Sequence, residues 1–427
     1  MKKTLVALAA LAATASFAQS SVQIIGVLDI GVQAASAPAT VTTAPVITTY
    51  TPVSSTVTTA TYTGSATGAA SNASLTRVAQ NGVSTSAIKF VGSEDIGGGL
   101  KAGFLLEINP NLVQSSTSNQ ANAFASEYTG TPFNGEQFIN LSGNFGDVKL
   151  GVPNAGMLDT MSIAQPFGTA LGSFYSAGTA MGRLGTVAPG IVSGVNSGSA
   201  RIIRHERSVQ YVTPTFSGFK ASFTYAAPND NTSALANQDG YQDITAMYSN
   251  GPLNVAYTNA VNKFGNNPVL TLGGAYANVG VTSGNSTTYA LGVLATPNSV
   301  GSKIVNGDYT YNALAANYTM GATTVYAGYT TTKSNGGVVA EDASSYNVAA
   351  KYVMGSIDLL GNYTVRFSNL TTANNASVLG LGANYNLSKR TSVYYRYELA
   401  DQNLDSKAAT AGGSVTSVNA IGLRHVF

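Results

Sequence analysis

The chain has 427 residues, with no Cys, no Trp, only 2 His and 9% charged side chains, whereas an ordinary soluble domain is roughly 25% charged. This composition argues against a typical cytosolic enzyme, and the absence of Cys excludes disulfides, thiolate metal sites and cysteine nucleophiles. Lys2 and Lys3 account for the formal net charge of +2, so the rest of the chain is charge-balanced and its charge predicts no nucleic-acid partner.

Residues 1–18 have the pattern of a cleaved signal peptide. Lys2 and Lys3 precede an apolar run, and Ser16, Phe17 and Ala18 form a small-x-small cleavage pattern. The apolar run is shorter than the ~20 residues that a spanning helix needs. We therefore expect export rather than anchoring, with residues 19–427 forming a single domain.

Most of the chain after residue 19 reads as strands in which apolar and polar side chains alternate. The segments 22–33, 100–108, 219–225 and 356–367 show this alternation, which puts one kind of side chain on each face of a pleated strand. A soluble β-sandwich would alternate in the same way, but it would also need a charged exterior. The composition therefore favours an all-β fold, a transmembrane antiparallel barrel with lipid outside and water inside.

Long polar stretches and short turns separate these strands. The segment 34–76, rich in Thr, Ala and Ser, is expected to be a flexible surface loop, and a second long connection runs from 154 to about 201. The uncharged stretch 161–182 contains Pro166 and several Gly, so a loop or short helix is favoured over a membrane span. Short turns are expected at 95–99, 144–147, 215–218 and 250–252.

Tyr318, Tyr352 and Tyr385 each end a strand before a short turn, at nearly constant spacing along the chain. Tyr is enriched at the boundary between membrane and water. We expect these side chains to contribute to an aromatic girdle at one rim of the barrel.

Five segments carry motifs in a fixed order: Ser93-Glu-Asp-Ile-Gly-Gly-Gly-Leu-Lys-Ala102, Phe138-Ile-Asn-Leu-Ser-Gly143 before Phe145-Gly146, Ser208-Val-Gln-Tyr211 with Pro214 and Phe216, Tyr385-Asn-Leu-Ser-Lys-Arg-Thr391, and Gly422-Leu-Arg-His-Val-Phe427. Together they resemble the general porins of Gram-negative outer membranes, of the β-proteobacterial type. The resemblance spans residues 22–427, interrupted by the segment 34–76.

The resemblance implies a homotrimer of sixteen-stranded barrels in the outer membrane, each a passive diffusion channel for small hydrophilic solutes and ions. It implies contact with lipid and lipopolysaccharide, and no cofactor. The third surface loop would fold into the lumen; here it maps to 154–201, with its tip at Pro166, Phe167 and Gly168. Phe427 would be the signal that the barrel-assembly machinery reads. Counting turns gives eighteen strands instead, with 270–294 as an extra hairpin.

The sequence departs from the family at several arginines. Ala87 and Gly135 stand where the family usually has Arg, and Arg207 stands where it has Asn, whereas Arg204 matches a family arginine. Alternation predicts further charged side chains facing the lumen, and we expect a weak anion preference whose sign depends on their arrangement. The candidates for lining the pore or its constriction are Lys89, Lys101, Glu107, Arg204, Arg207, Arg366 and Arg396, with Lys149, Lys220 and Arg424, and Asp159 on the constricting loop.

Three other functions stay open. An outer-membrane enzyme is disfavoured, because the two histidines, His205 and His425, form no triad pattern and no metalloprotease or phosphate-binding motif occurs. A substrate-specific sugar channel would suit abundant Tyr and eighteen strands. An adhesin would use the Thr-rich loop and need no open lumen.

Overall fold

The computed structural model describes residues 21–36, 74–113, 135–174, 203–227, 240–270, 277–283, 286–292, 302–336, 342–369, 375–401 and 415–427. The predicted signal peptide, most of the segment 34–76 and residues 175–202 of the predicted constriction loop lie outside these ranges. Within them, no helix has the length and hydropathy needed to cross a membrane.

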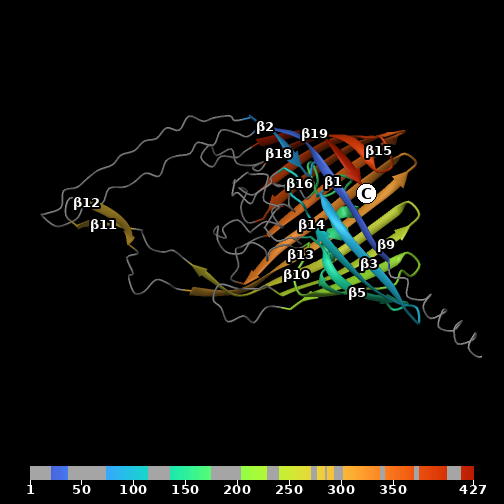
Figure 1. The fold of residues 1–427 in the computed structure, drawn as a ribbon, viewed down its shortest axis with the longest axis horizontal. Coiled ribbons are helices and arrows are strands. Elements are labelled where there is room, and N and C mark those ends of the chain that lie inside the picture. Colours follow the sequence, from blue (N-terminus) through green and yellow to red (C-terminus); the bar gives the residue numbers. More distant parts are fainter. Residues whose placement is uncertain are drawn as a thin grey trace, which may run out of the picture.

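Sixteen antiparallel strands form a closed barrel (Figure 1). Each strand pairs with the next along the ring, and β1 joins both β3 and β19. The strands of the ring are β1 (Ser21–Ser36), β3 (Ala87–Gly97), β4 (Leu100–Ile108), β5 (Gln137–Gly143), β6 (Gly146–Val152), β7 (Ser208–Val212), β8 (Phe219–Ala226), β9 (Gly240–Asn250), β10 (Leu253–Leu270), β13 (Ser302–Met320), β14 (Thr323–Gly336), β15 (Asp342–Met354), β16 (Ile357–Ser368), β17 (Ala376–Asn386), β18 (Thr391–Asp401) and β19 (Val415–Val426).

Three further strands lie outside the ring. β2 (Ser74–Gln80) pairs with the second half of β1. β11 (Ala277–Ser283) and β12 (Ser286–Gly292) form a separate two-stranded sheet. The count of eighteen strands was therefore wrong: the segment 270–294 does contain a hairpin, but that hairpin pairs with itself and adds nothing to the barrel.

The strands expose their apolar side chains and bury their polar ones, which is the reverse of a soluble sandwich. On β1, Ile24 is 58% exposed whereas Asp29 is fully buried. On β16, Tyr363 and Phe367 are exposed whereas Thr364 is buried. This inverted pattern is that of a barrel surrounded by lipid, and it confirms the expected fold.

The four short turns predicted from the sequence join neighbouring strands, from β3–β4 to β9–β10. Gly321 and Gly355 have φ of 57° and 60° in the turns after β13 and β15, a left-handed conformation that glycine adopts without strain. Tyr318, Tyr352 and Tyr385 lie near this end of their strands with exposed side chains. The sequence thus located one rim of the barrel.

The segment 34–76, expected to be a loop, begins and ends in strands. β1 reaches Ser36 and β2 begins at Ser74.

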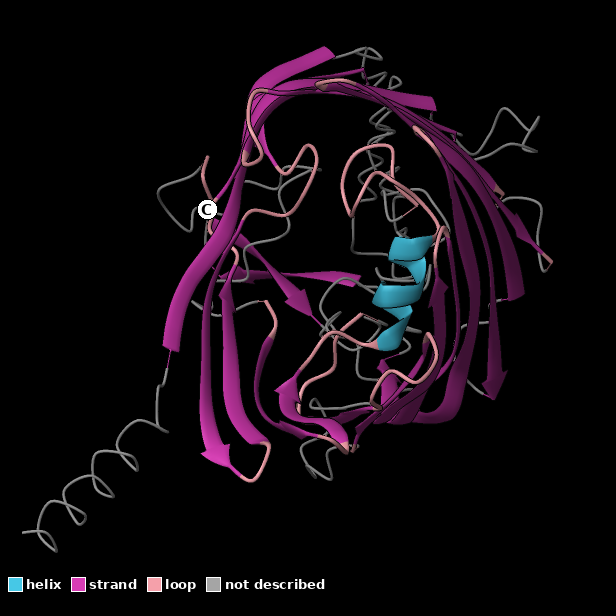
Figure 2. Cartoon of the chain, turned by 90° about the vertical axis from the view of Figure 1, so that its right-hand side faces the viewer, coloured by secondary structure: helices cyan, strands magenta, loops and turns pink. Residues whose placement is uncertain are grey.

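A short helix, α2 (Gly156–Ile163), lies inside the ring of strands (Figure 2). Its residues pack against β9, β10 and β13. The main cluster of buried apolar side chains therefore lies between α2 and the inner wall, and the helix narrows the lumen from that side.

Candidate functional site

Backbone and side-chain contacts fix the first turn of α2 to the wall. The Gly156 N–H donates to Asp243 Oδ2 at 3.1 Å, and the Thr258 hydroxyl donates to the Gly156 carbonyl at 3.2 Å. A Cβ on Gly156 would lie 1.8 Å from Thr245 Oγ1. Glycine is therefore required here for the close approach of the helix to β9 and β10.

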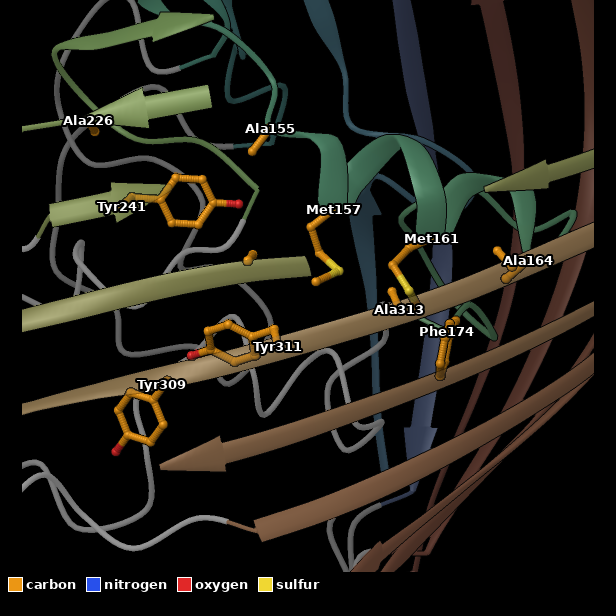
Figure 3. Close-up of a cluster of buried hydrophobic side chains, with 12 residues drawn as sticks. Ala155, Met157, Met161, Ala164, Phe174, Ala226, Tyr241, Tyr309, Tyr311 and Ala313 are labelled. Atoms are coloured by element: carbon orange, nitrogen blue, oxygen red, sulfur yellow. The ribbon is translucent and has the colours of Figure 1, made fainter. Parts of the chain in front are cut away.

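One face of α2 is anchored by apolar contact. Met157, Met161 and Ala164 are buried together with Phe174 in a cluster that includes Tyr311 on β13 (Figure 3). The unbranched Met side chains fill an irregular gap between helix and wall. Thr160, between them, is bonded at 2.6 Å to Thr258 on β10, so the helix is held against the wall along its whole length.

Three inward-facing asparagines hold the backbone that follows. The side-chain amides of Asn317, Asn347 and Asn362 donate to the carbonyls of Ile163 at 3.0 Å, Ala164 at 2.8 Å and Gly172 at 2.9 Å. The carbonyls at a helix C-terminus lack partners within the helix. Asn317 on β13 and Asn347 on β15 supply those partners, and Asn362 on β16 binds the loop farther along the wall.

The predicted tip of the loop is pinned to the wall. Phe167 is buried, with the Arg396 guanidinium 5.5 Å from its ring centre. The Gly172 N–H donates to Glu398 Oε2 at 2.6 Å. Both wall residues lie on β18, so the loop crosses from β9 to β18 along the inner face of the barrel.

This path corrects two predicted pore-lining residues. Arg366 and Arg396 point inward as the alternation predicts, but each is only 1% exposed. The Arg396 side chain donates to the carbonyls of Ala383 and Tyr395 and to Asn384. The constriction loop packs on Arg396 through Phe167, so this arginine supports the loop, and the burial of both arginines keeps their charges out of the water of the lumen.

A second group of charges lies at the base of the loop. Glu107 on β4 pairs with Lys89 Nζ at 2.9 Å and with Arg204 Nη2 at 4.0 Å. The Arg204 Nε donates to Asn154 Oδ1 at 2.6 Å, and Asn154 donates its backbone N–H and its amide to Glu136 at 3.0 and 3.1 Å. Because Asn154 and Arg204 lie at the two ends of the constriction loop, this group joins both ends to the barrel wall.

Asp159 presents the one acidic side chain of α2. It is exposed to the lumen, but the surrounding protein displaces enough water to raise the pKa of its carboxyl above the ordinary value. Lys220 and Lys149 oppose this increase in pKa by their positive charge. Lys149 also lies 4.9 Å from the ring centre of Phe138. Lys149 on β6 and Lys220 on β8 are thus near enough for their charges to act on Asp159.

Two further predicted residues, Lys101 and Arg207, lie at or beside turns. Lys101 is exposed beside the turn that joins β3 and β4. Arg207 is exposed in a turn before β7, with φ of 56°, so the alternation that predicted its direction does not apply there. Sequence reasoning missed Glu136 and the three asparagines, although their polar types at inward positions were a usable signal.

The buried histidine supports structure. The His205 ring stacks on Tyr241 with centroids 3.7 Å apart, and burial lowers its pKa to about 3. Tyr241 in turn donates to Asp243, the residue that accepts from the start of α2. No cluster of three potential metal ligands occurs among the described residues.

Comparison with known proteins agrees with this geometry. The family described as Gram-negative porin matches residues 4–405. The chain is 27% identical over 444 residues to outer membrane porin protein 32 of Delftia acidovorans, covering 100% of both chains. It is similar in structure to an anion-selective porin from Comamonas acidovorans, with TM-score 0.64, 23% identity and coverage of 96% and 100%.

A more distant likeness is to OmpT of Vibrio cholerae in trimer form, with TM-score 0.57, 15% identity and coverage of 96% of this chain and 99% of that one. That likeness supports the fold. The inverted barrel, the inward loop and the family match together confirm the resemblance found in the sequence. The chain therefore belongs to the Gram-negative porins, as a general porin of the β-proteobacterial type that forms a passive channel across the outer membrane.

Proposed function

We propose that this porin passes small hydrophilic solutes and ions with a weak preference for anions, and that it catalyses no reaction. The observation that carries the proposal is the pair Lys149 and Lys220 opposite Asp159 on the constriction loop. Positive charge along a narrow passage lowers the energy of a passing anion.

The balance of charge around the loop explains why the preference is weak. Glu107 offsets Lys89 and Arg204 through the two ion pairs at the loop base. Lys149 and Lys220 have no carboxylate within ion-pair distance in the described part of the chain, but Asp159 is near enough to influence both. Glu136 is also near enough to act on Asp159. The cations named around the loop (Lys89, Lys149, Lys220 and Arg204) therefore outnumber the acids (Glu107, Glu136 and Asp159) only slightly.

The test is the reversal potential of Lys149→Gln/Lys220→Gln in a salt gradient. We expect the ratio of anion to cation permeability to fall about two- to fivefold in dilute salt and much less in 1 M salt, where the Debye length is only ~3 Å. Lys389→Gln, in the exposed turn between β17 and β18, is the matched control. A clear cation preference of the unmodified protein would refute the proposal.

Most tyrosines in the described part of the chain lie outside the lumen, which disfavours a sugar-specific pathway. Tyr257, Tyr346 and Tyr395 are among the many whose side chains are exposed on the outer surface of the barrel. Tyr309 and Tyr311 are buried in the cluster with α2. A stacking surface for sugars would need a series of aromatic faces along the lumen, and the tyrosines named here lie outside it or under α2, so diffusion without a specific substrate fits better.

The assembly completes the proposal. We propose a homotrimer embedded in lipid and lipopolysaccharide, as the trimeric form of the Vibrio cholerae relative suggests, after removal of residues 1–18 and with 37–73 as an external loop. The terminal Phe427 would be read by the barrel-assembly machinery. Crosslinking of the detergent-extracted protein should yield a trimer; a monomer alone would contradict this part.

A further inference from the structure

The strand pairing beside β1 is interrupted at one place. Gln80 at the end of β2 pairs with Ile30, and Ala87 at the start of β3 pairs with Val27. Residues 81–86 therefore lie opposite only Leu28 and Asp29, and they must leave the plane of the sheet. We call residues 81–86 the inner bulge.

Side chains replace the missing pairing, so the inner bulge is a defined structure. The Ser86 hydroxyl accepts from the Asp29 N–H at 3.0 Å and lies 3.3 Å from the Asp29 carbonyl, to which it donates. The Asn81 side chain accepts from the Ser86 N–H at 2.8 Å, and Asn81 itself has φ of 66°. Its two ends are thus joined to each other and to β1.

The inner bulge projects into the lumen. Asp29 is fully buried and inward, since its neighbour Ile30 is exposed on the outer face. Its Oδ2 accepts from the N–H groups of Val83 at 2.6 Å and Ser84 at 2.8 Å. Because Val83 and Ser84 donate to a side chain on the inner face, the segment that carries them must lie on that face as well.

Two other strands support the same segment. Tyr394 on β18 donates to Asp29 Oδ1 at 2.6 Å, and a Cβ on Gly82 would lie 2.4 Å from that hydroxyl. Arg424 on β19 donates from Nε to Ser84 Oγ at 3.2 Å. Asp29 therefore organises a contact that reaches from β1 to β18.

The inner bulge meets the constriction loop. A Cβ on Gly168 would lie 3.1 Å from the Val83 carbonyl oxygen, and Gly168 has φ of 67°. The preceding residue, Phe167, packs on Arg396, whose guanidinium is also 5.6 Å from the Tyr394 ring centre. The two inward segments are thus in contact at the side of the barrel formed by β1, β18 and β19.

We propose that the inner bulge is a second constriction element, which together with the constriction loop determines the size and ion preference of the pore, and that Asp29 is its positioning residue. The bulge itself carries no charge. Arg424 is bonded to it at Ser84, and Lys89 follows three residues after its end, on β3, so its position affects how much of each cation a passing ion meets. The side chain of Asp29 holds the bulge in place through two hydrogen bonds, from Val83 and Ser84, and is itself held by a third from Tyr394 on β18.

The chain contains no Cys, so a single introduced thiol can be modified selectively. Ser84→Cys and Thr85→Cys each place one thiol in the bulge, and Ser356→Cys places one in the exposed turn between β15 and β16. Each variant is treated, as reconstituted channels, with a cationic or an anionic methanethiosulfonate reagent, and modification is verified by mass.

We expect modification in the bulge to cause stepwise loss of single-channel current. The cationic reagent should shift the reversal potential toward anion preference and the anionic reagent toward cation preference. Modified Ser356→Cys should conduct as before. Complete modification at 84 or 85 without either change would overturn the proposal, as would failure of both thiols to react while the thiol at 356 reacts.

The role of Asp29 is tested by Asp29→Ala, which removes the acceptor of three hydrogen bonds. We expect a changed mean current with more noise, because the bulge loses its anchor while β1 keeps its pairing with β19. Asp95→Ala is the matched control, since Asp95 accepts one backbone N–H in the exposed β3–β4 turn. If folded Asp29→Ala channels conducted like the control, Asp29 would have no positioning role; if that variant does not fold, the cysteine series still decides whether the bulge lines the pore.

Discussion

Two effects on the pKa of the Asp159 carboxyl oppose each other: exclusion of water raises it, and the positive charges of Lys220 and Lys149 lower it. The carboxyl has a raised pKa because the protein around it displaces water, and protonation removes its negative charge from the lumen. A raised pKa means that the carboxyl begins to protonate at a higher pH than a free carboxyl does.

Lowering the pH from 7 toward 4 should therefore increase the preference for anions, because Lys149 and Lys220 keep their charge while Asp159 loses its own. Asp159→Asn should show the increased preference already at pH 7, with little further change on acidification. Reversal potentials across this range measure both effects. Glu94→Gln, at an exposed site on β3, should behave like the unmodified protein; an equal effect there would remove Asp159 from the explanation.

His205 makes the fold sensitive to acid. The folded protein holds its ring neutral with a pKa of about 3, against 6.5 for the free side chain. The unfolded state therefore binds a proton below pH 6.5 that the folded state does not bind. The contribution of His205 to the free energy of unfolding is therefore fully present above pH 6.5. It falls between pH 6.5 and 3, by on the order of 1 kcal/mol per pH unit.

The measurement is the temperature at which the detergent-solubilised barrel unfolds, as a function of pH. His205→Phe keeps a ring to stack on Tyr241 and cannot titrate, so its unfolding temperature should fall less on acidification. His425→Phe removes an exposed ring bonded to Thr391 and serves as the control. Identical pH profiles for all three proteins would contradict this account.

At the scale of elements, the constriction loop is held by polar contacts from the wall as much as by its apolar face. Asn347→Ala removes the amide that donates to the Ala164 carbonyl. A buried carbonyl left without a partner costs about 1–3 kcal/mol, so the end of α2 should detach more often. Single-channel recordings should show more frequent current fluctuations at an unchanged unfolding temperature of the barrel.

Asn250→Ala is the control for that variant, because Asn250 makes its one side-chain bond to Tyr248 in an exposed turn. Quiet currents in Asn347→Ala would indicate that Met157, Met161 and Phe174 hold the loop without help from the wall asparagines.

At the scale of the whole molecule, pairing between the first strand, β1, and the last strand, β19, closes the barrel. β1 and β19 pair from Val27 to Ser36, and Phe427 exchanges two backbone hydrogen bonds with Gly26, of 2.9 and 3.0 Å. Deletion of Phe427 removes these bonds and the predicted assembly signal together.

We expect that deletion to reduce the amount of heat-modifiable barrel in the outer membrane several-fold. Phe216→Ala, which changes an exposed aromatic side chain in the β7–β8 turn, should assemble normally. Refolding both proteins in detergent separates the loss of the signal from the loss of the hydrogen bonds to Gly26. A deletion variant that refolds normally in vitro but assembles poorly in cells has lost the signal. A deletion variant that assembles normally in cells would show that neither the signal nor the hydrogen bonds are required.

The sequence predicted a barrel of porin type because lipid on one face and water on the other require alternate side chains to differ, as Tyr363 and Thr364 do. It also located the turns and the inward loop. It did not predict that Arg366 and Arg396 would be buried, or that 277–292 would pair apart from the ring, because both depend on what packs against a strand.

The sequence by itself determined which side chains point inward, since direction on a strand is a local property of the backbone. Only the tertiary structure decided which inward charges meet water: the constriction loop crosses the wall from β9 to β18 and packs on Arg396 there, whereas Asp159 stays exposed with Lys149 and Lys220 near it. That choice depends on contacts between residues far apart in the chain, such as Asn362 with Gly172 and Asp29 with Tyr394, which no local pattern encodes.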